Sequence, residues 1–253
     1  MKNKSRNKII TGRQPIIEAI KAGKALERIF LSKRSVGDSI RELRQLAQDS
    51  QIPVNSVPEE KLNRLHPARR SGKNDQGCVA IVSKVTYLDL QAVISHVIEK
   101  GETPLFVLVD GITDVRNIGA MARSALCCGA QAMILPQKGV APLNEEAVKS
   151  SAGALEHIAV CRVNHLKEAA KILHLNGFQI LASDMAGNKL LADCDWTSPS
   201  AVVMGAEDKG VQPALLRTAE EIFKIPMATD FDSFNVSVAT GIVLYEAMKQ
   251  RGS

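Results

Sequence analysis

From residue 105 onwards, short apolar runs alternate with stretches whose apolar residues recur at helical spacing, and this alternation restricts the possible folds most. Apolar strands that alternate with helices are typical of a parallel sheet with helices on both faces, so we predict an α/β domain. The predicted strands span 105–110, 132–135, 157–161, 178–183, 201–204 and 221–225, and the predicted helices span 118–128, 145–151, 165–175, 213–219 and 235–249.

The preceding residues predict a separate, smaller α/β unit that is strongly basic. Its helices are predicted at 15–22, 39–49 and 59–65, and its strands at 28–31, 53–57 and 78–82. Residues 1–84 hold 18 Lys and Arg against 8 Asp and Glu, whereas the remainder holds 14 against 19. This asymmetry favours a polyanion as the partner of the first unit. We expect a first domain at 1–84, a linker with a helical stretch at 85–103, and a second domain at 104–253.

Composition and cysteine content exclude several classes of protein. With 45% hydrophobic and 23% charged residues, the chain has an ordinary globular composition, which excludes disordered and fibrous proteins. Its five cysteines are odd in number and lack C-x-x-C spacing, so we expect neither a disulfide framework nor a metal site. The apolar runs are far shorter than the ~20 residues of a membrane helix, and nothing resembles a signal peptide. We expect a soluble, cytoplasmic protein.

Polar loops follow three of the predicted strands, at the sheet edge where ligands bind in open parallel sheets. In the first, Asn117 stands where we expect a helix N-cap, and Gly119 and Arg123 lie four residues apart on one helix face. A guanidinium beside a position without a side chain leaves room for a substrate backbone. The alternative interpretation is structural: a cap, a packing glycine and a solvated charge.

The second loop, at 203–211, is rich in glycine and follows a strongly apolar strand, an arrangement that usually cradles a nucleotide. Glu207 stands in place of the middle glycine of the dinucleotide fingerprint, where a carboxylate would repel a pyrophosphate. Val211 follows Gly210, which excludes the phosphate-binding G-x-x-x-x-G-K-[ST] loop. The loop favours a ligand without phosphates. A tight turn with an acidic tip is the alternative.

The third loop, at 225–237, runs into the last predicted helix. Ser233 and Asn235 at the helix start offer neutral hydrogen-bonding groups beside exposed backbone amides. For each residue taken alone, the pattern favours the alternative interpretation of a helix cap. The coincidence of three unusual polar loops at strand ends in one domain favours a shared functional site.

In order and spacing, the three loops resemble the motifs of the SpoU/TrmH family of RNA ribose 2′-O-methyltransferases, within the SPOUT superfamily. The matching residues are Asn117, Gly119 and Arg123 in the first motif, Gly205, Glu207 and Gly210 in the second, and Ile225-Pro-Met with Ser233-Phe-Asn-Val-Ser237 in the third. Phe234 replaces a usual Leu, and Asp208 a usual Gly. The first unit resembles the ribosomal-protein-like RNA-binding domain of the ribosomal RNA branch, through the Gly12 region and Gln76-Gly77, although Asp75 stands where that branch often has His.

This resemblance implies a C-terminal parallel-sheet SPOUT domain with a deep trefoil knot, which binds S-adenosylmethionine and works as a homodimer on RNA. The implied cofactor-binding residues are Met204, Gly205, Gly210, Ile225, Met227 and Phe234. A bent cofactor held largely by main-chain groups agrees with the absence of a dinucleotide-type glycine loop.

The implied reaction displaces the sulfonium methyl with a ribose 2′-hydroxyl, and five residues receive roles in it. Arg123 stabilises the developing alkoxide, since a guanidinium holds its proton too tightly to act as a base. The proton acceptor stays open between water and an RNA phosphate. Asn117 positions the nucleotide or Arg123, and Glu207 holds a guanidinium or favours the sulfonium. Ser233 and Asn235 orient the substrate.

RNA contacts are expected from Arg69, Arg70 and Lys73 in a polar loop of the first domain, and from Arg116. For the loop, an ordinary solvated charge run is the alternative. Because aromatic residues are few, we expect recognition of RNA shape and backbone.

The expected target is a guanosine in 23S ribosomal RNA, with transfer RNA or an antibiotic-resistance site as alternatives. A catalytically silent RNA-binding or ribosome-assembly protein is the non-enzymatic rival, and the missing fingerprint disfavours a nucleotide-dependent oxidoreductase.

Overall fold

The computed structural model describes residues 8–66, 76–229 and 233–252, and the chain forms two compact units. The first extends to Thr86 and includes Leu143–Glu145, and the second comprises Tyr87–Pro142 and the chain from Glu146. Arg69, Arg70 and Lys73 lie outside the described residues. No helix in the described part of the chain is long and apolar enough to cross a membrane.

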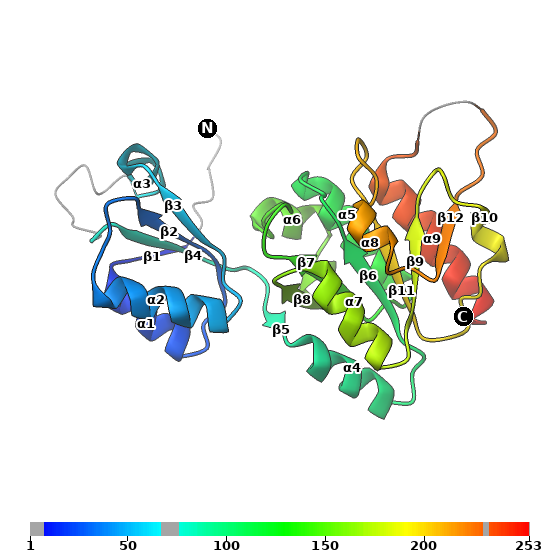
Figure 1. The fold of residues 1–253 in the computed structure, drawn as a ribbon, viewed down its shortest axis with the longest axis horizontal. Coiled ribbons are helices and arrows are strands. Elements are labelled where there is room, and N and C mark those ends of the chain that lie inside the picture. Colours follow the sequence, from blue (N-terminus) through cyan, green and yellow to red (C-terminus); the bar gives the residue numbers. More distant parts are fainter. Residues whose placement is uncertain (1–7, 67–75, 230–232, 253) are drawn as a thin grey trace. The chain divides into compact units, whose positions relative to one another are not determined.

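The first unit is a four-stranded sheet of order β1-β4-β2-β3 with helices on both faces (Figure 1). Its strands are β1 (Ile9–Thr11), β2 (Leu26–Ser32), β3 (Val54–Val57) and β4 (Cys78–Val82), and its helices are α1 (Arg13–Lys21), α2 (Asp38–Asp49) and α3 (Glu59–Leu65). Neighbouring residues of β2 point to opposite faces, so Ile29 and Leu31 pack with α1 and α2, whereas Phe30 packs with Leu62 of α3. The six predicted elements are present, and β1 is an additional edge strand that the sequence analysis missed.

The second unit contains an eight-stranded parallel sheet of order β10-β12-β9-β11-β6-β7-β8-β5, which confirms the predicted α/β parallel-sheet fold. Its strands are β5 (Tyr87–Leu88), β6 (Leu105–Val109), β7 (Ala132–Pro136), β8 (Ala159–Val163), β9 (Gln179–Ser183), β10 (Lys189–Leu190), β11 (Ser200–Met204) and β12 (Glu221–Lys224). The strand expected from residue 157 begins at Ala159, because a 3-10 turn at Ala154–Glu156 precedes it.

Helices cover both faces of this sheet (Figure 1). They are α4 (Leu90–Glu99), α5 (Val115–Cys127), α6 (Glu145–Ser150), α7 (Leu166–Leu175), α8 (Pro213–Leu216) and α9 (Val236–Gln250), with a further 3-10 turn at Leu191–Asp193. The apolar stripes of α4, α7 and α8 pack with Phe106 and Leu108 of β6 on one face. On the other face α5 packs against α9. The carboxyl ends of β6, β9, β11 and β12 therefore lie next to one another at one edge.

Strand β12 lies between β9 and β10, two strands that precede it in the chain. The connection at 184–188 must therefore pass across β12. Gly187 permits this close crossing, since a Cβ atom there would lie 2.6 Å from the carbonyl carbon of Phe223. The backbone of the connection is tied to β12 where Asp184 N–H donates to Phe223 O at 2.9 Å.

Candidate functional site

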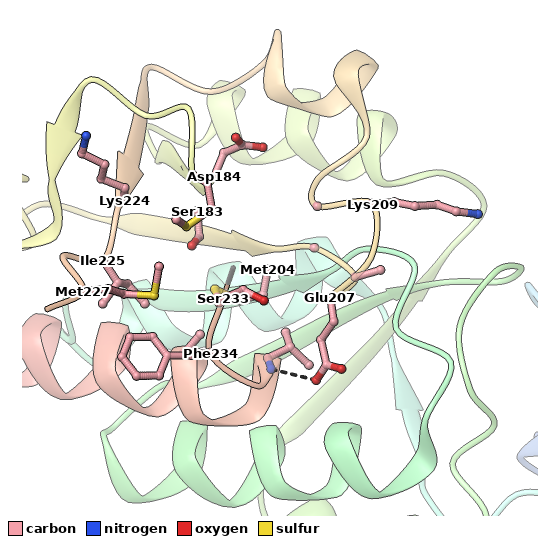
Figure 2. Close-up of a pocket in the computed structure, with 16 residues that line it drawn as sticks. Ser183, Asp184, Met204, Glu207, Lys209, Lys224, Ile225, Met227, Ser233 and Phe234 are labelled. Carbon is pink, nitrogen blue, oxygen red and sulfur yellow. Dashed lines mark hydrogen bonds between the residues drawn. The ribbon is translucent and has the colours of Figure 1, made fainter. Parts of the chain in front are cut away.

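A cavity of about 320 Å³ opens at the carboxyl ends of β9, β11 and β12 (Figure 2). Its walls come from the residues after β9, the loop after β11, the end of β12 and the start of α9. The structure brings together in this lining Met204, Gly205, Gly210, Ile225, Met227 and Phe234, together with Glu207 and Ser233. Asn117, Arg123 and Asn235 are not among the lining residues.

The loop after β11 is a tight turn whose glycines permit close backbone packing. Gly210 N–H donates to Ala206 O at 2.8 Å, and Gly210 has a φ of +63°, which favours glycine. A Cβ atom on Gly205 would lie 2.2 Å from the carbonyl carbon of Gly210, so only glycine fits there. Glu207 stands exposed near the tip of this turn. The structure thus combines the two interpretations of this loop, because the acidic turn also borders a cavity.

One carboxylate oxygen of Glu207 joins the three loops. Glu207 Oε1 accepts hydrogen bonds from Asn235 Nδ2 at 2.6 Å, Val236 N at 3.1 Å and Asn117 Nδ2 at 3.2 Å. Asn235 Nδ2 also donates to Asn117 Oδ1 at 3.1 Å. The carboxylate lies at the N-terminus of α9, where the exposed backbone N–H groups and the helix dipole favour a negative charge. The expectation that Glu207 holds a guanidinium differs from this arrangement, in which its described partners are amides.

The N-cap of α5 is Asp114, so the expectation that Asn117 caps this helix was wrong. The helix begins three residues earlier than predicted, and Asp114 Oδ1 accepts from Arg116 N–H at 2.8 Å. This backbone hydrogen bond holds the pKa of the Asp114 carboxyl below its usual value. Asn117 lies in the first helical turn instead, which frees its side-chain amide to reach Glu207.

Gly119 packs against α6, so the predicted open space beside it for a substrate backbone does not exist. A Cβ atom on Gly119 would lie 1.9 Å from Ser150 Oγ and 2.5 Å from Ala147 O, which makes this glycine a packing contact. Arg123 is exposed and makes no hydrogen bond or ion pair with the residues that the structure describes. Arg116 is also exposed, with its Nη2 3.5 Å from Asp114 Oδ2.

Asn235 both caps a helix and contributes to the hydrogen-bond cluster. Its Oδ1 accepts from Ser237 N–H at 3.0 Å, so the interpretation of Asn235 as a helix cap was correct. Its Nδ2 also donates to Glu207 Oε1 and Asn117 Oδ1. Ser233 is half-buried in the wall of the cavity.

Sequence reasoning missed the residues that follow β9 and β6. Ser183, the last residue of β9, and Asp184 and Met185, which follow it, line the cavity, and their position at the end of a predicted strand was the available signal. Asp110, at the end of β6, is buried and accepts from Gln212 N at 2.7 Å and Gln212 Nε2 at 2.6 Å. This pair fixes the far end of the loop after β11 to the neighbouring strand.

Comparisons with known proteins agree with this architecture. The profile described as "SpoU rRNA Methylase family" matches residues 104–245, and that described as "RNA 2'-O ribose methyltransferase substrate binding" matches residues 9–88. The chain is 28% identical over 242 residues to a Bacillus subtilis protein named as a TrmH family tRNA/rRNA methyltransferase, covering 96% of this chain and 95% of that one. It is 31% identical over 245 residues to a Mycobacterium ulcerans protein named as a tRNA/rRNA methyltransferase, covering 96% and 77%.

Solved structures share the fold. The SpoU methyltransferase AviRb of Streptomyces viridochromogenes, in complex with AdoMet, superposes with a TM-score of 0.60 at 24% identity, covering 99% of this chain and 94% of that chain. The AdoMet-bound rRNA methyltransferase of Sinorhizobium meliloti superposes equally well, with a TM-score of 0.60 at 24% identity over 98% and 88%. The family match spans more than half of the chain and confirms the resemblance drawn from the three motifs. The chain therefore belongs to the SpoU/TrmH family of S-adenosylmethionine-dependent RNA 2′-O-ribose methyltransferases.

Proposed function

We propose that this chain methylates the ribose 2′-hydroxyl of a guanosine in 23S ribosomal RNA, in the cytoplasm and as a homodimer, with S-adenosylmethionine in the cavity described above. The observation that carries the proposal is the hydrogen-bond cluster of Asn117, Glu207 and Asn235, which unites the three loops at the cavity. S-adenosylmethionine supplies the methyl group from its sulfonium centre.

The residues of the cavity fit such a cofactor. A volume of about 320 Å³ is within the range of small-molecule sites. Gly205 and Gly210 keep side chains out of the turn, so its backbone can approach a ligand. Met204, Ile225, Met227 and Phe234 add apolar surface on which an adenine ring can pack.

The placement of the proposed catalytic residues supports the roles assigned to them. Arg123 is unpaired among the described residues, so its guanidinium is available to stabilise the alkoxide that forms at the ribose. Asn117 is held by Glu207 and positions the nucleotide, and Ser233 orients the substrate from the wall of the cavity. Glu207 is a positioning residue: by accepting hydrogen bonds from the amides of Asn117 and Asn235, it holds the three loops in a fixed arrangement.

RNA binding is assigned to the first unit, whose basic charge suits the phosphate backbone. The match to a substrate-binding region at residues 9–88 supports this assignment. Arg69, Arg70 and Lys73 remain proposed contacts there, and Arg116 is the proposed contact of the second unit.

A homodimer is supported by exposed apolar residues on the two helices that pack together on one face of the sheet. Tyr245 and Val238 of α9 and Leu126 of α5 are 59%, 50% and 38% exposed. A second copy of the chain that covers these residues would remove the apolar surface from water.

A knot is supported by the position of β12. This late strand lies between β9 and β10, the position that it would take if the end of the chain passed through the loop formed by residues 184–199. Such threading is the geometry that a deep trefoil knot requires, and it is a rare exception among protein folds.

The test combines calorimetry with methyl transfer. We expect the purified protein to bind S-adenosylmethionine and to transfer a labelled methyl group to ribosomal RNA from a strain that lacks the gene. Methylation of transfer RNA alone would overturn the proposed target, and RNA binding without heat from millimolar S-adenosylmethionine would identify a catalytically silent protein.

The variant Arg123→Ala should lose most turnover and keep cofactor binding. Arg217→Ala is the matched control, because Arg217 is an exposed arginine of the same unit outside the three motifs. Near-normal turnover of Arg123→Ala would contradict the role assigned to Arg123.

A further inference from the structure

Asp184 lines the cavity from the end of β9 and belongs to none of the three motif loops. It is one of the acidic residues that border the cavity, and Figure 2 shows it on the opposite side from Glu207. Its carboxylate therefore faces a different part of any ligand held there.

The backbone and side chain of Asp184 are both fixed. Its N–H donates to Phe223 O at 2.9 Å, and its carbonyl oxygen accepts from Gly187 N–H at 3.0 Å. The side-chain oxygen Oδ1 of Asp184 accepts a hydrogen bond from Ala186 N–H at 2.9 Å. A carboxylate held in this way loses little conformational freedom when it binds a ligand.

The second carboxylate oxygen is available to a ligand. Asp184 Oδ2 receives no hydrogen bond from the residues that the structure describes. It faces Gly210, where a Cβ atom would lie only 3.3 Å from it. The glycine therefore keeps open the space between this oxygen and the turn after β11.

A carboxylate only accepts hydrogen bonds, so it selects a donor on the ligand. In S-adenosylmethionine the donors at a distance from the reacting methyl are the ribose hydroxyls, the adenine amine and the ammonium of the amino-acid part. The adenine suits the apolar residues Ile225, Met227 and Phe234. Lys209 and Lys224 line the same cavity with their ammonium ends directed away from its middle (Figure 2), and these positive charges at its border disfavour a further cation.

We infer that Asp184 binds the ribose diol of S-adenosylmethionine, an inference that rests on the cofactor site proposed above. Carboxylates bind ribose hydroxyls in other nucleotide sites, where they likewise follow a strand of a parallel sheet. Asp184 thus selects the adenosine part of the cofactor, whereas the Glu207 cluster organises the side at which methyl transfer occurs.

The test measures binding by calorimetry for the wild type, Asp184→Asn and Asp208→Asn. The ligands are S-adenosylmethionine, S-adenosylhomocysteine and methylthioadenosine, all of which carry the diol. Asp184→Asn should weaken all three by the same factor, roughly tenfold, because the acceptor of the ribose hydroxyls keeps an oxygen but loses its negative charge. Asp208→Asn makes the same change of charge on an exposed neighbour of Glu207 and should alter none of them.

The 2′,3′-dideoxy form of methylthioadenosine gives the sharpest comparison, because it lacks both ribose hydroxyls. The wild type and Asp184→Asn should therefore bind this ligand with the same affinity. A loss confined to S-adenosylmethionine would assign Asp184 to the sulfonium and overturn the inference. A loss for the two amino-acid ligands with unchanged methylthioadenosine would assign it to the ammonium, with the same consequence. Unchanged binding of all ligands would also overturn it, while failure of the wild type to bind any of them would instead refute the proposed cofactor site.

Discussion

Replacement of Glu207 by alanine tests whether one carboxylate oxygen holds the three loops together. The change removes the acceptor of three hydrogen bonds, from Asn117 Nδ2, Asn235 Nδ2 and Val236 N–H. It also removes a negative charge from the N-terminus of α9. The first turn of α9 should therefore open more often, and the loop after β11 should lose its link to α5.

The expected cost follows from the hydrogen bonds. A hydrogen bond to a charged group contributes about 1.5–3 kcal/mol, and a charge at a helix N-terminus contributes roughly 0.3–1 kcal/mol. The three donors share one oxygen of an exposed side chain, so their contributions do not add fully. We expect a local destabilisation of about 2 kcal/mol in Glu207→Ala, and about half of that in Glu207→Gln, which keeps the oxygen and loses the charge.

Hydrogen exchange measured by mass spectrometry reports on this change locally. A cost of about 2 kcal/mol corresponds to exchange roughly 30-fold faster for the amides of the first turn of α9, while the amides of the first unit should exchange as before. Asp208→Ala is the matched control and should behave like the wild type. If Glu207→Ala left both the exchange of this turn and methyl transfer unchanged, the network would not have the role that its geometry indicates.

Three further predictions concern other parts of the second unit. Arg251 donates to four backbone carbonyls, so Arg251→Ala should lower the free energy of unfolding by about 3 kcal/mol, and Arg251→Lys should restore little of it; thermal unfolding measures both. In Gly205→Ala the new methyl group would lie 2.2 Å from the backbone of Gly210, so calorimetry should find cofactor binding at least roughly tenfold weaker at unchanged secondary structure. Burial raises the pKa of the Cys161 thiol to about 12, so at pH 8 it stays protonated; iodoacetamide should label exposed Cys127 in the folded protein and Cys161 only after denaturation, as mass spectrometry can establish.

The sequence predicted those parts of the fold that depend on local periodicity. The apolar runs that became β6, β7, β9 and β11 were identified because each is buried on both faces and flanked by helical stretches. The strands β5 and β10 have two residues each, which is too short to produce a recognisable pattern. The position of β12 between β9 and β10 depends on strand order, which local periodicity does not encode.

The site was predicted in its composition and less well in its contacts. Residues of the second and third loops line the cavity, whereas Asn117 of the first loop is linked to it only through its hydrogen bond to Glu207. The helix that carries Asn117 also begins earlier than predicted, because Asp114 is the better-placed cap. Gly119 packs against a helix that is distant in sequence from the first motif, and such a contact is invisible to spacing rules. Asp184 was not predicted because it belongs neither to a glycine-rich stretch nor to a cap-like pattern, the two signals that mark the other loops.

The insertion of β12 between two earlier strands also sets an order for assembly of the protein. While the chain is being synthesised, β9 and β10 are made first and have no partner between them until residues 221–224 follow. The end of β12 and the start of α9 also supply walls of the cavity, among them Ile225, Met227 and Phe234. In a nascent chain the cavity proposed to hold the cofactor is therefore incomplete until β12 and α9 are made, so cofactor binding would report that the whole second unit has folded.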